Sequence, residues 1–179
     1  MKATGIVRRI DDLGRIVIPK EIRRTMRIRE GDPLEIYTES DGTVIFKKYS
    51  PIGELSEFAS QYAESLAKTT GLGCCISDKD TIIAVSGVPK KELADKKLSS
   101  EAEKIMNNKS VFLSTKSSKD VAVVDGNDNY KAGAIAPIVF EGDSIGTVMI
   151  IAPDSNRDFG DVESKLAEVA AGFLGKTME

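Results

Sequence analysis

The residues with the clearest chemical potential in this 179-residue chain are its arginines. Seven of the eight lie between Arg8 and Arg29, although the chain as a whole carries a net charge of −3. A guanidinium group stays charged at physiological pH and donates paired hydrogen bonds to a phosphate or to guanine. A concentrated group of arginines on an acidic protein therefore predicts a polyanionic partner for one part of the chain.

The charge divides the chain at about residue 50. Residues 1–50 hold 11 basic and 8 acidic residues, a net charge of +3, whereas residues 51–179 hold 14 and 20, a net charge of −6. The alternative interpretation is that the arginines only keep a surface in contact with water, as runs of charge usually do. Lysine fills that role in the rest of the chain, so the concentration of arginine favours nucleic-acid binding.

Missing residues and motifs argue against catalysis. The chain has no histidine, which removes histidine-based triads, most catalytic zinc sites and the commonest general base near neutral pH. It also has no complete Gly-x-x-x-x-Gly-Lys-Ser/Thr phosphate loop. We therefore expect no enzyme, no metal and no cofactor, and we assign no cofactor-binding residues.

The only cysteines, Cys74 and Cys75, are adjacent. Neighbouring side chains of a strand point to opposite faces, so a disulfide between these two would need unusual geometry. A redox switch is one interpretation, and two inert buried thiols in an apolar strand are the interpretation we favour. No apolar run approaches the length of a membrane span and no signal peptide is visible, so we expect a cytoplasmic protein without a membrane partner.

The first fifty residues predict a small ββαββ unit. Two β-prone runs, 6–10 and 15–18, join through Asp11-Asp12-Leu13-Gly14, and a hairpin of residues 34–39 and 43–48 turns at Asp41-Gly42. Between them, Pro19 takes the first position of a helix that runs to about Met26. Spacing of i, i+3, i+4 and i+7 gives that helix one cationic face. The members of this face are Lys20, Arg23, Arg24 and Arg27.

So small a unit buries too little surface to be stable alone. Two copies that interleave their strands would share one core, which predicts a domain-swapped homodimer. Its basic residues would then occur twice about a two-fold axis, an arrangement that suits double-stranded DNA with approximate dyad symmetry.

Residues 1–24 resemble the AbrB-type swapped-hairpin regulators of spore-forming bacteria. The resemblance is carried by the Asp-x-Leu-Gly-Arg-x-Val-Ile-Pro core, Asp11-Asp12-Leu13-Gly14-Arg15-Ile16-Val17-Ile18-Pro19, and by the Ile22-Arg23-Arg24 that follows. It implies a domain-swapped dimeric β-barrel with arginines facing DNA, and it covers residues 1–50. The positions that match the family's DNA-facing arginines are Arg8, Arg15, Arg23 and Arg24, and Arg9 and Lys20 are nearby candidates. Antitoxins share this fold more loosely.

Residues 51–179 predict a second, α+β domain. Ser50 and Pro51 begin a helix to about residue 69, which Gly71 ends, and further helices span 99–108 and 159–176. The strands expected between them are 72–77, 81–86, 110–114, 121–124, 130–140 and 144–152. This order resembles a GAF domain, a small-molecule sensor module with an antiparallel sheet. Loops 78–81, 86–97 and 114–119 would surround any ligand pocket.

The concentration of arginine predicts a DNA-binding protein, and the resemblance implies a sequence-selective regulator of sporulation genes. Its GAF-like domain either senses an unidentified small molecule as well as assembling the protein, or serves as an oligomerisation scaffold alone. The apolar stripes Leu55–Leu66 and Val162–Phe173 of its first and last helices predict a second self-association surface. Pairing of these domains within one swapped dimer would leave a dimer, and pairing between dimers would give a tetramer. The resemblance favours the homotetramer. The alternative function is an antitoxin-like or scaffold protein whose basic patch binds an acidic protein.

Overall fold

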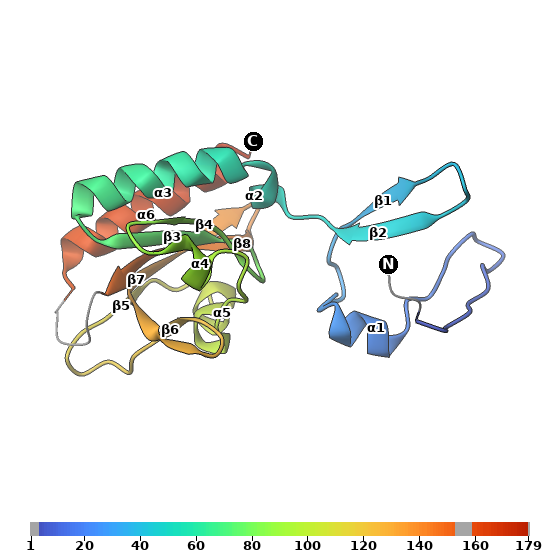
Figure 1. The fold of residues 1–179 in the computed structure, drawn as a ribbon, viewed down its shortest axis with the longest axis horizontal. Helices are drawn as coiled ribbons and strands as arrows, with labels where there is room; N and C mark the ends of the chain where they lie inside the picture. The colour runs from blue at the N-terminus through green and yellow to red at the C-terminus, as the bar shows by residue number, and fades with distance from the viewer. Residues whose placement is uncertain (1–3, 153–158, 179) are drawn as a thin grey trace. The chain divides into compact units, whose positions relative to one another are not determined.

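The fold is that of a computed structural model, which describes residues 4–152 and 159–178. The chain forms two compact units, Met1–Tyr49 and Ser50–Glu179, and each is described by itself. The first unit runs from dark blue to cyan in Figure 1, and the second runs from teal to red.

The described residues of the first unit form one short helix and one hairpin. Helix α1 spans Lys20–Thr25, and strand β1 (Leu34–Thr38) pairs with β2 (Val44–Lys48) in antiparallel register. Inside the turn, the Asp41 carboxylate accepts a hydrogen bond from the Thr43 N–H at 2.8 Å. The hairpin predicted around Asp41-Gly42 is thus confirmed, with each strand about a residue shorter than expected.

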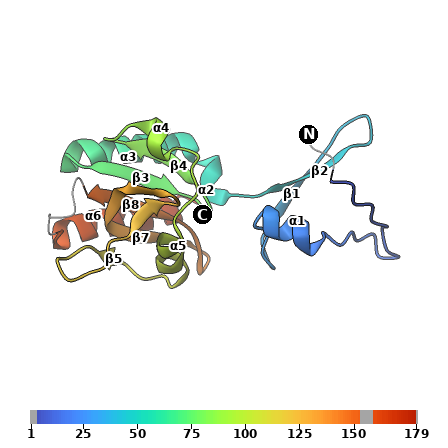
Figure 2. The same ribbon diagram turned by 60° about the horizontal axis from the view of Figure 1, so that its bottom comes forward.

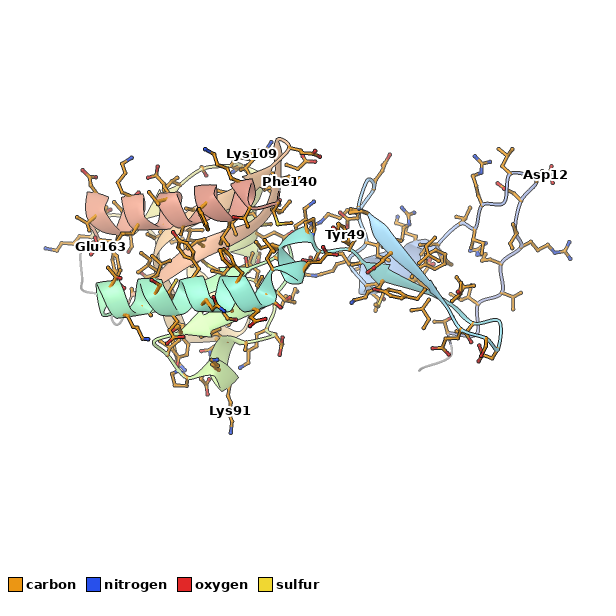
Figure 3. The ribbon with its side chains drawn as sticks, turned by 90° about the horizontal axis from the view of Figure 1, so that it is seen from above. Asp12, Tyr49, Lys91, Lys109, Phe140 and Glu163 are labelled. Carbon is orange, nitrogen blue, oxygen red and sulfur yellow. The ribbon has the colours of Figure 1, made fainter. Side chains whose placement is uncertain are left out.

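The two strands predicted at residues 6–10 and 15–18 are absent from the single chain, so this part of the prediction is wrong for one copy. The turn between them does form, because the Gly14 N–H donates to the Asp11 carbonyl oxygen at 2.9 Å, and Asp12 lies at its tip (Figure 3). Gly14 takes a positive φ of 74°, which glycine adopts without strain. Among the described residues of this unit, neither arm of the turn has a strand partner, and no barrel closes.

Helix α1 is shorter than its sequence pattern suggests. Pro19 precedes the helix as its N-cap residue with ψ 147°, rather than occupying the first helical position. At the other end the Ile28 N–H donates to the Arg23 carbonyl at 2.8 Å, and Arg27 takes a left-handed φ of 52°. This bond closes a Schellman-type turn, so Arg27 lies beyond the helix and not on its cationic face.

The first unit has almost no core of its own. Pro19 is the only buried residue among its described positions. Twelve of its large apolar side chains are exposed, and Val7 at 91% and Leu13 at 74% are the most exposed of them. The others are Ile6, Ile10, Ile16, Val17, Met26, Ile36, Tyr37, Val44, Phe46 and Tyr49.

The second unit is built on an antiparallel sheet in the order β4-β3-β8-β7-β5, with β6 also paired to β7. Its strands are β3 (Gly73–Ser77), β4 (Ile82–Ser86), β5 (Phe112–Leu113), β6 (Ala122–Val124), β7 (Asn127–Phe140) and β8 (Asp143–Ala152). Its helices are α2 (Pro51–Glu54), α3 (Ser56–Thr70), α4 (Lys90–Leu93), α5 (Ser100–Asn107) and α6 (Asp161–Lys176).

Helices cover both faces of this sheet. Helices α3 and α6 lie side by side on one face, and α4 and α5 lie on the other (Figures 1 and 2). Each face has its own apolar core, and alternate residues of a strand enter opposite cores. Cys74 and Cys75 follow this rule, one in each core, and both are free thiols, as predicted.

Local signals account for most helix ends in this unit. The Gly53 N–H donates to Ser50 Oγ at 3.2 Å, and Pro51 follows that cap as predicted. The single helix expected over 51–69 breaks at Leu55, however, so α2 is one short turn and α3 begins at Ser56. The four-residue α4 lies within the segment 86–97 that was predicted as a loop.

Helix α6 carries two apolar stripes rather than one. Ala167, Ala170, Ala171 and Leu174 are buried against the sheet. The predicted stripe lies beside them and is largely exposed, with Val162 at 69% and Val169 at 63%. No helix of the described residues is long and apolar enough to cross a membrane.

Candidate nucleic-acid interface

Six cationic side chains of the first unit stand at its surface. Arg8 and Arg9 precede the Asp11–Gly14 turn, Arg15 follows it, and Lys20, Arg23 and Arg24 belong to α1. All six are exposed, so none contributes to a core. On α1 the spacing i, i+3 and i+4 brings its three cations to one side of the helix.

Arg15 is held by Asp11 of the same turn. Its Nε donates to Asp11 Oδ2 at 2.8 Å, while Asp11 Oδ1 accepts from the backbone N–H groups of Arg15 at 2.8 Å and Leu13 at 3.0 Å. Hydrogen bonds from Arg15, first from its backbone and then from its side chain, lower the pKa of Asp11. The Arg15 side chain is nevertheless 69% exposed, which leaves its other N–H groups open to a ligand.

The two remaining arginines of this segment differ from the others in being half-buried. The Arg27 carbonyl oxygen accepts from Lys48 Nζ at 3.1 Å, and Arg27 Nη1 is buried without a hydrogen-bond partner among the described residues. The Arg29 N–H donates to Asp32 Oδ2 at 2.8 Å. These arginines therefore belong to the framework that joins α1 to the hairpin, a distinction that residue type and spacing do not reveal.

Two shallow clefts are lined by described residues of the second unit. One, of about 570 Å³, lies between the segment before β6, the β6–β7 pair and the start of α5. The other, of about 550 Å³, lies between α3 and the segment after β4. Two of the three predicted rim segments, 114–119 and 86–97, line these clefts, and segment 78–81 lines neither. No group of three or more metal-ligating side chains occurs in the part of the chain that the structure describes.

Comparison with known proteins matches both units. Residues 54–179 match the family model described as stage V sporulation protein T C-terminal, transcription factor, and residues 7–53 match that of the antidote-toxin recognition protein MazE, a bacterial antitoxin. The transition state regulatory protein AbrB of Bacillus subtilis is 61% identical over 51 residues, which are 28% of this chain and 52% of that protein.

The fold of the second unit has a solved counterpart. The GAF domain of an Acinetobacter phosphoenolpyruvate-protein phosphotransferase superposes with a TM-score of 0.56 at 12% identity, covering 69% of this chain and 81% of that one. This likeness establishes a GAF-like fold and nothing of its ligand.

One relative spans the whole chain. The stage V sporulation protein T of Bacillus subtilis is 53% identical over 180 residues, 100% of this chain and 99% of that protein. Together with the family model over residues 54–179, this identity shows that the chain belongs to the stage V sporulation protein T family of transcription factors.

Proposed function

We propose that this transcription factor regulates sporulation genes by binding double-stranded DNA through two copies of its first unit. In this proposal residues 1–50 bind DNA and residues 51–179 assemble the protein and sense a ligand. The DNA contacts are made by Arg8, Arg15, Arg23 and Arg24, with Arg9 and Lys20 beside them. One observation carries the assignment: all six cations are exposed, whereas Arg27 and Arg29 of the same segment are half-buried.

The mechanism is binding without a catalytic step. Contacts to phosphates supply affinity and a strong dependence on salt, while paired N–H groups of arginine and the deformability of the duplex supply selectivity. This role assigns the protein to the cytoplasm, where the chromosome of a bacterium lies.

A second copy of the chain completes the first unit in this proposal. Among its described residues, a single copy of this unit exposes twelve large apolar side chains and buries only Pro19. The arms on either side of the Asp11–Gly14 turn also lack strand partners, and unpaired backbone groups favour pairing with another strand. Interleaving two copies supplies both a core and partners, and it presents the cations twice about a dyad.

The outer face of α3 and α6 extends this dimer to a homotetramer. Phe173 of α6 stacks on Phe58 and Tyr62 of α3, with ring centroids 5.7 and 5.6 Å apart. Val162 and Val169 lie in line with Phe173 on α6 and are exposed in the single chain. A stripe with this spacing, outside the stripe that packs on the sheet, is typical of a helix that packs against a second partner.

Ligand sensing is the second role that we propose for the GAF-like unit. Its two clefts are lined partly by connecting loops, which vary most in sequence and commonly carry the residues that bind ligands. Mass spectrometry of small molecules that co-purify with residues 51–179 tests this role. A unit that retains nothing, and still assembles, would be a scaffold alone.

The match to the MazE model favours one alternative, in which the basic unit neutralises an acidic toxin protein. A gel shift separates the two functions. A DNA regulator shifts promoter DNA at concentrations that leave an equal length of unrelated DNA free, whereas an antitoxin of this kind needs no such preference.

The site itself is tested by Arg15→Ala, Arg23→Ala and Arg24→Ala. Each should weaken operator binding by about tenfold to a hundredfold, since a base-contacting arginine contributes about 1–3 kcal/mol of discrimination. Circular dichroism should stay unchanged, because an exposed guanidinium contributes little to the core. Lys165→Ala, which removes an exposed cation from the second unit, is the matched control. Unchanged affinity in all three arginine variants would reject the site.

A further inference from the structure

The Asp11 carboxylate divides its two oxygen atoms between two tasks. Oδ1 accepts the backbone N–H groups of Leu13 and Arg15 and thereby holds the turn, as aspartate commonly does in such turns. Among the described residues, Oδ2 accepts only the Arg15 Nε–H, at 2.8 Å. The second contact is not needed to close the turn, so it acts on the arginine side chain.

That contact determines which edge of the guanidinium is free. Arginine has five N–H donors in one plane, and a ligand such as guanine or phosphate takes two of them at once. With Nε bonded to Asp11, the edge formed by the two Nη groups faces away from the carboxylate. Because a long side chain loses rotamer freedom when it binds, an arginine already fixed in one direction loses less on contact with DNA.

We infer that Asp11 is a positioning residue that presents the Nη edge of Arg15 to DNA. The inference rests on the proposed function of Arg15 and deepens it. It assigns a favourable role in DNA binding to a negatively charged residue, which simple charge repulsion from the phosphates would oppose.

Asp12 provides a matched control within the same turn. It carries the same charge, is also exposed, lies one residue along at the tip of the turn (Figure 3), and makes no hydrogen bond to Arg15 among the described residues. Repulsion alone predicts that neutralising either aspartate tightens DNA binding. Positioning predicts opposite signs for the two.

The test compares Asp11→Asn with Asp12→Asn in the full-length protein. Asparagine at residue 11 keeps an oxygen for the two backbone N–H groups, so the turn is retained, but its NH₂ group cannot accept from Arg15 Nε. The probe is a duplex selected from a random pool by the unsubstituted protein, with a scrambled duplex of equal composition beside it. Asp11→Asn should weaken binding to the selected duplex by about threefold to tenfold. This is less than the loss of a whole bidentate arginine contact, because Arg15 remains and loses only its fixed orientation. Asp12→Asn should leave it unchanged or tighten it.

A double-mutant cycle separates this inference from the proposed function. In an Arg15→Ala background, Asp11→Asn should no longer weaken binding. In the free protein, carboxyl NMR titration should find the Asp11 pKa below the ordinary aspartate range, and Arg15→Ala should raise it. Equal effects of the two Asn variants, or an Asp11→Asn loss that persists without Arg15, would overturn the positioning role alone. If Arg15→Ala leaves DNA binding intact, the proposed contact of Arg15 fails and the inference fails with it.

Discussion

The two units of this chain solve the problem of burying apolar surface in opposite ways. Among the described residues, every buried apolar side chain except that of Pro19 belongs to Ser50–Glu179. That unit exposes five large apolar residues, whereas the much shorter Met1–Tyr49 exposes twelve. The second unit is therefore complete as a single chain and the first is not.

The difference suggests a division of labour. A unit that reads a symmetrical duplex benefits from folding only as a dimer, because a folded state then guarantees two copies of the cationic surface. A unit that links such dimers benefits from a stable core and a separate outer stripe, as α6 has. The net charges agree with this division, because the half proposed to bind DNA is positive and the half proposed to assemble the protein is negative.

The largest expected effect comes from diluting the isolated segment 1–50. Since its core requires a second copy, a thousandfold dilution should remove about 4 kcal/mol of apparent stability and unfold it. Residues 51–179 at the same concentrations should keep their circular dichroism spectrum and melting temperature. Sedimentation that finds a folded monomer of segment 1–50 at low concentration would contradict the interleaved dimer.

The second largest effect should be the loss of DNA affinity with salt, which we expect the first unit alone to determine. If the six cations of each copy neutralise phosphates, affinity should fall about 10³-fold or more between 50 and 200 mM salt. The slope of log affinity against log salt should be the same for segment 1–50 and for one DNA-binding head of the full chain, because residues 51–179 carry a net negative charge. A flat titration would mean that DNA is not the partner.

The comparison also explains which features could be predicted from sequence. The Asp41-Gly42 turn, the Ser50 cap and the Gly71 stop depend on neighbouring residues, and the structure contains each of them. The missing strands at 6–10 and 15–18 are different, because strand pairing depends on partners that one copy does not supply.

Errors within helices have more local causes. The i+7 spacing places Arg27 on the helix, but this residue lies in the left-handed turn that ends α1. A glycine usually marks such a turn, and here the residue is an arginine. The stripe of Val162 and Val169 was expected from its spacing, but spacing alone does not show that a second stripe of small residues packs on the sheet instead. The role of Asp11 depends on a side-chain contact within a turn, which no periodicity encodes.

Assembly should respond to charge on the outer face of α3 and α6. Phe58→Asp and Val169→Asp should each halve the mass of the full-length assembly in solution, from tetramer to dimer, because a carboxylate is costly to bury between helices. DNA binding by each dimer should persist. Val111→Asp, a similar change at an exposed valine before β5, should leave the mass unchanged. Light scattering that gives a dimer for the unsubstituted chain, or a tetramer indifferent to both changes, would reject this interface.

The smallest expected effect concerns the thiols of the second unit. Burial raises the pKa of Cys74 from an ordinary 9.0 to about 12 and that of Cys75 well above 9.0. The native thiols should therefore react with an alkylating reagent at pH 8 far more slowly than free cysteine, at a rate independent of protein concentration.

The same shifts give a pH dependence of stability. Because the folded pKa lies above the unfolded one, this contribution is fully present below about pH 9 and is lost as the pH rises toward 12, since only the unfolded chain releases the protons. A variant with Cys74→Ala and Cys75→Ala, although less stable at neutral pH, should lose less stability than the parent between pH 8 and 10. The difference should be at least about 1 kcal/mol, because a thiol that titrates only in the unfolded chain lowers the free energy of unfolding by about 1.4 kcal/mol for each pH unit above its unfolded pKa. Rapid alkylation of the folded protein, or equal losses in both proteins, would mean that the two cores are more open than those of a self-sufficient unit.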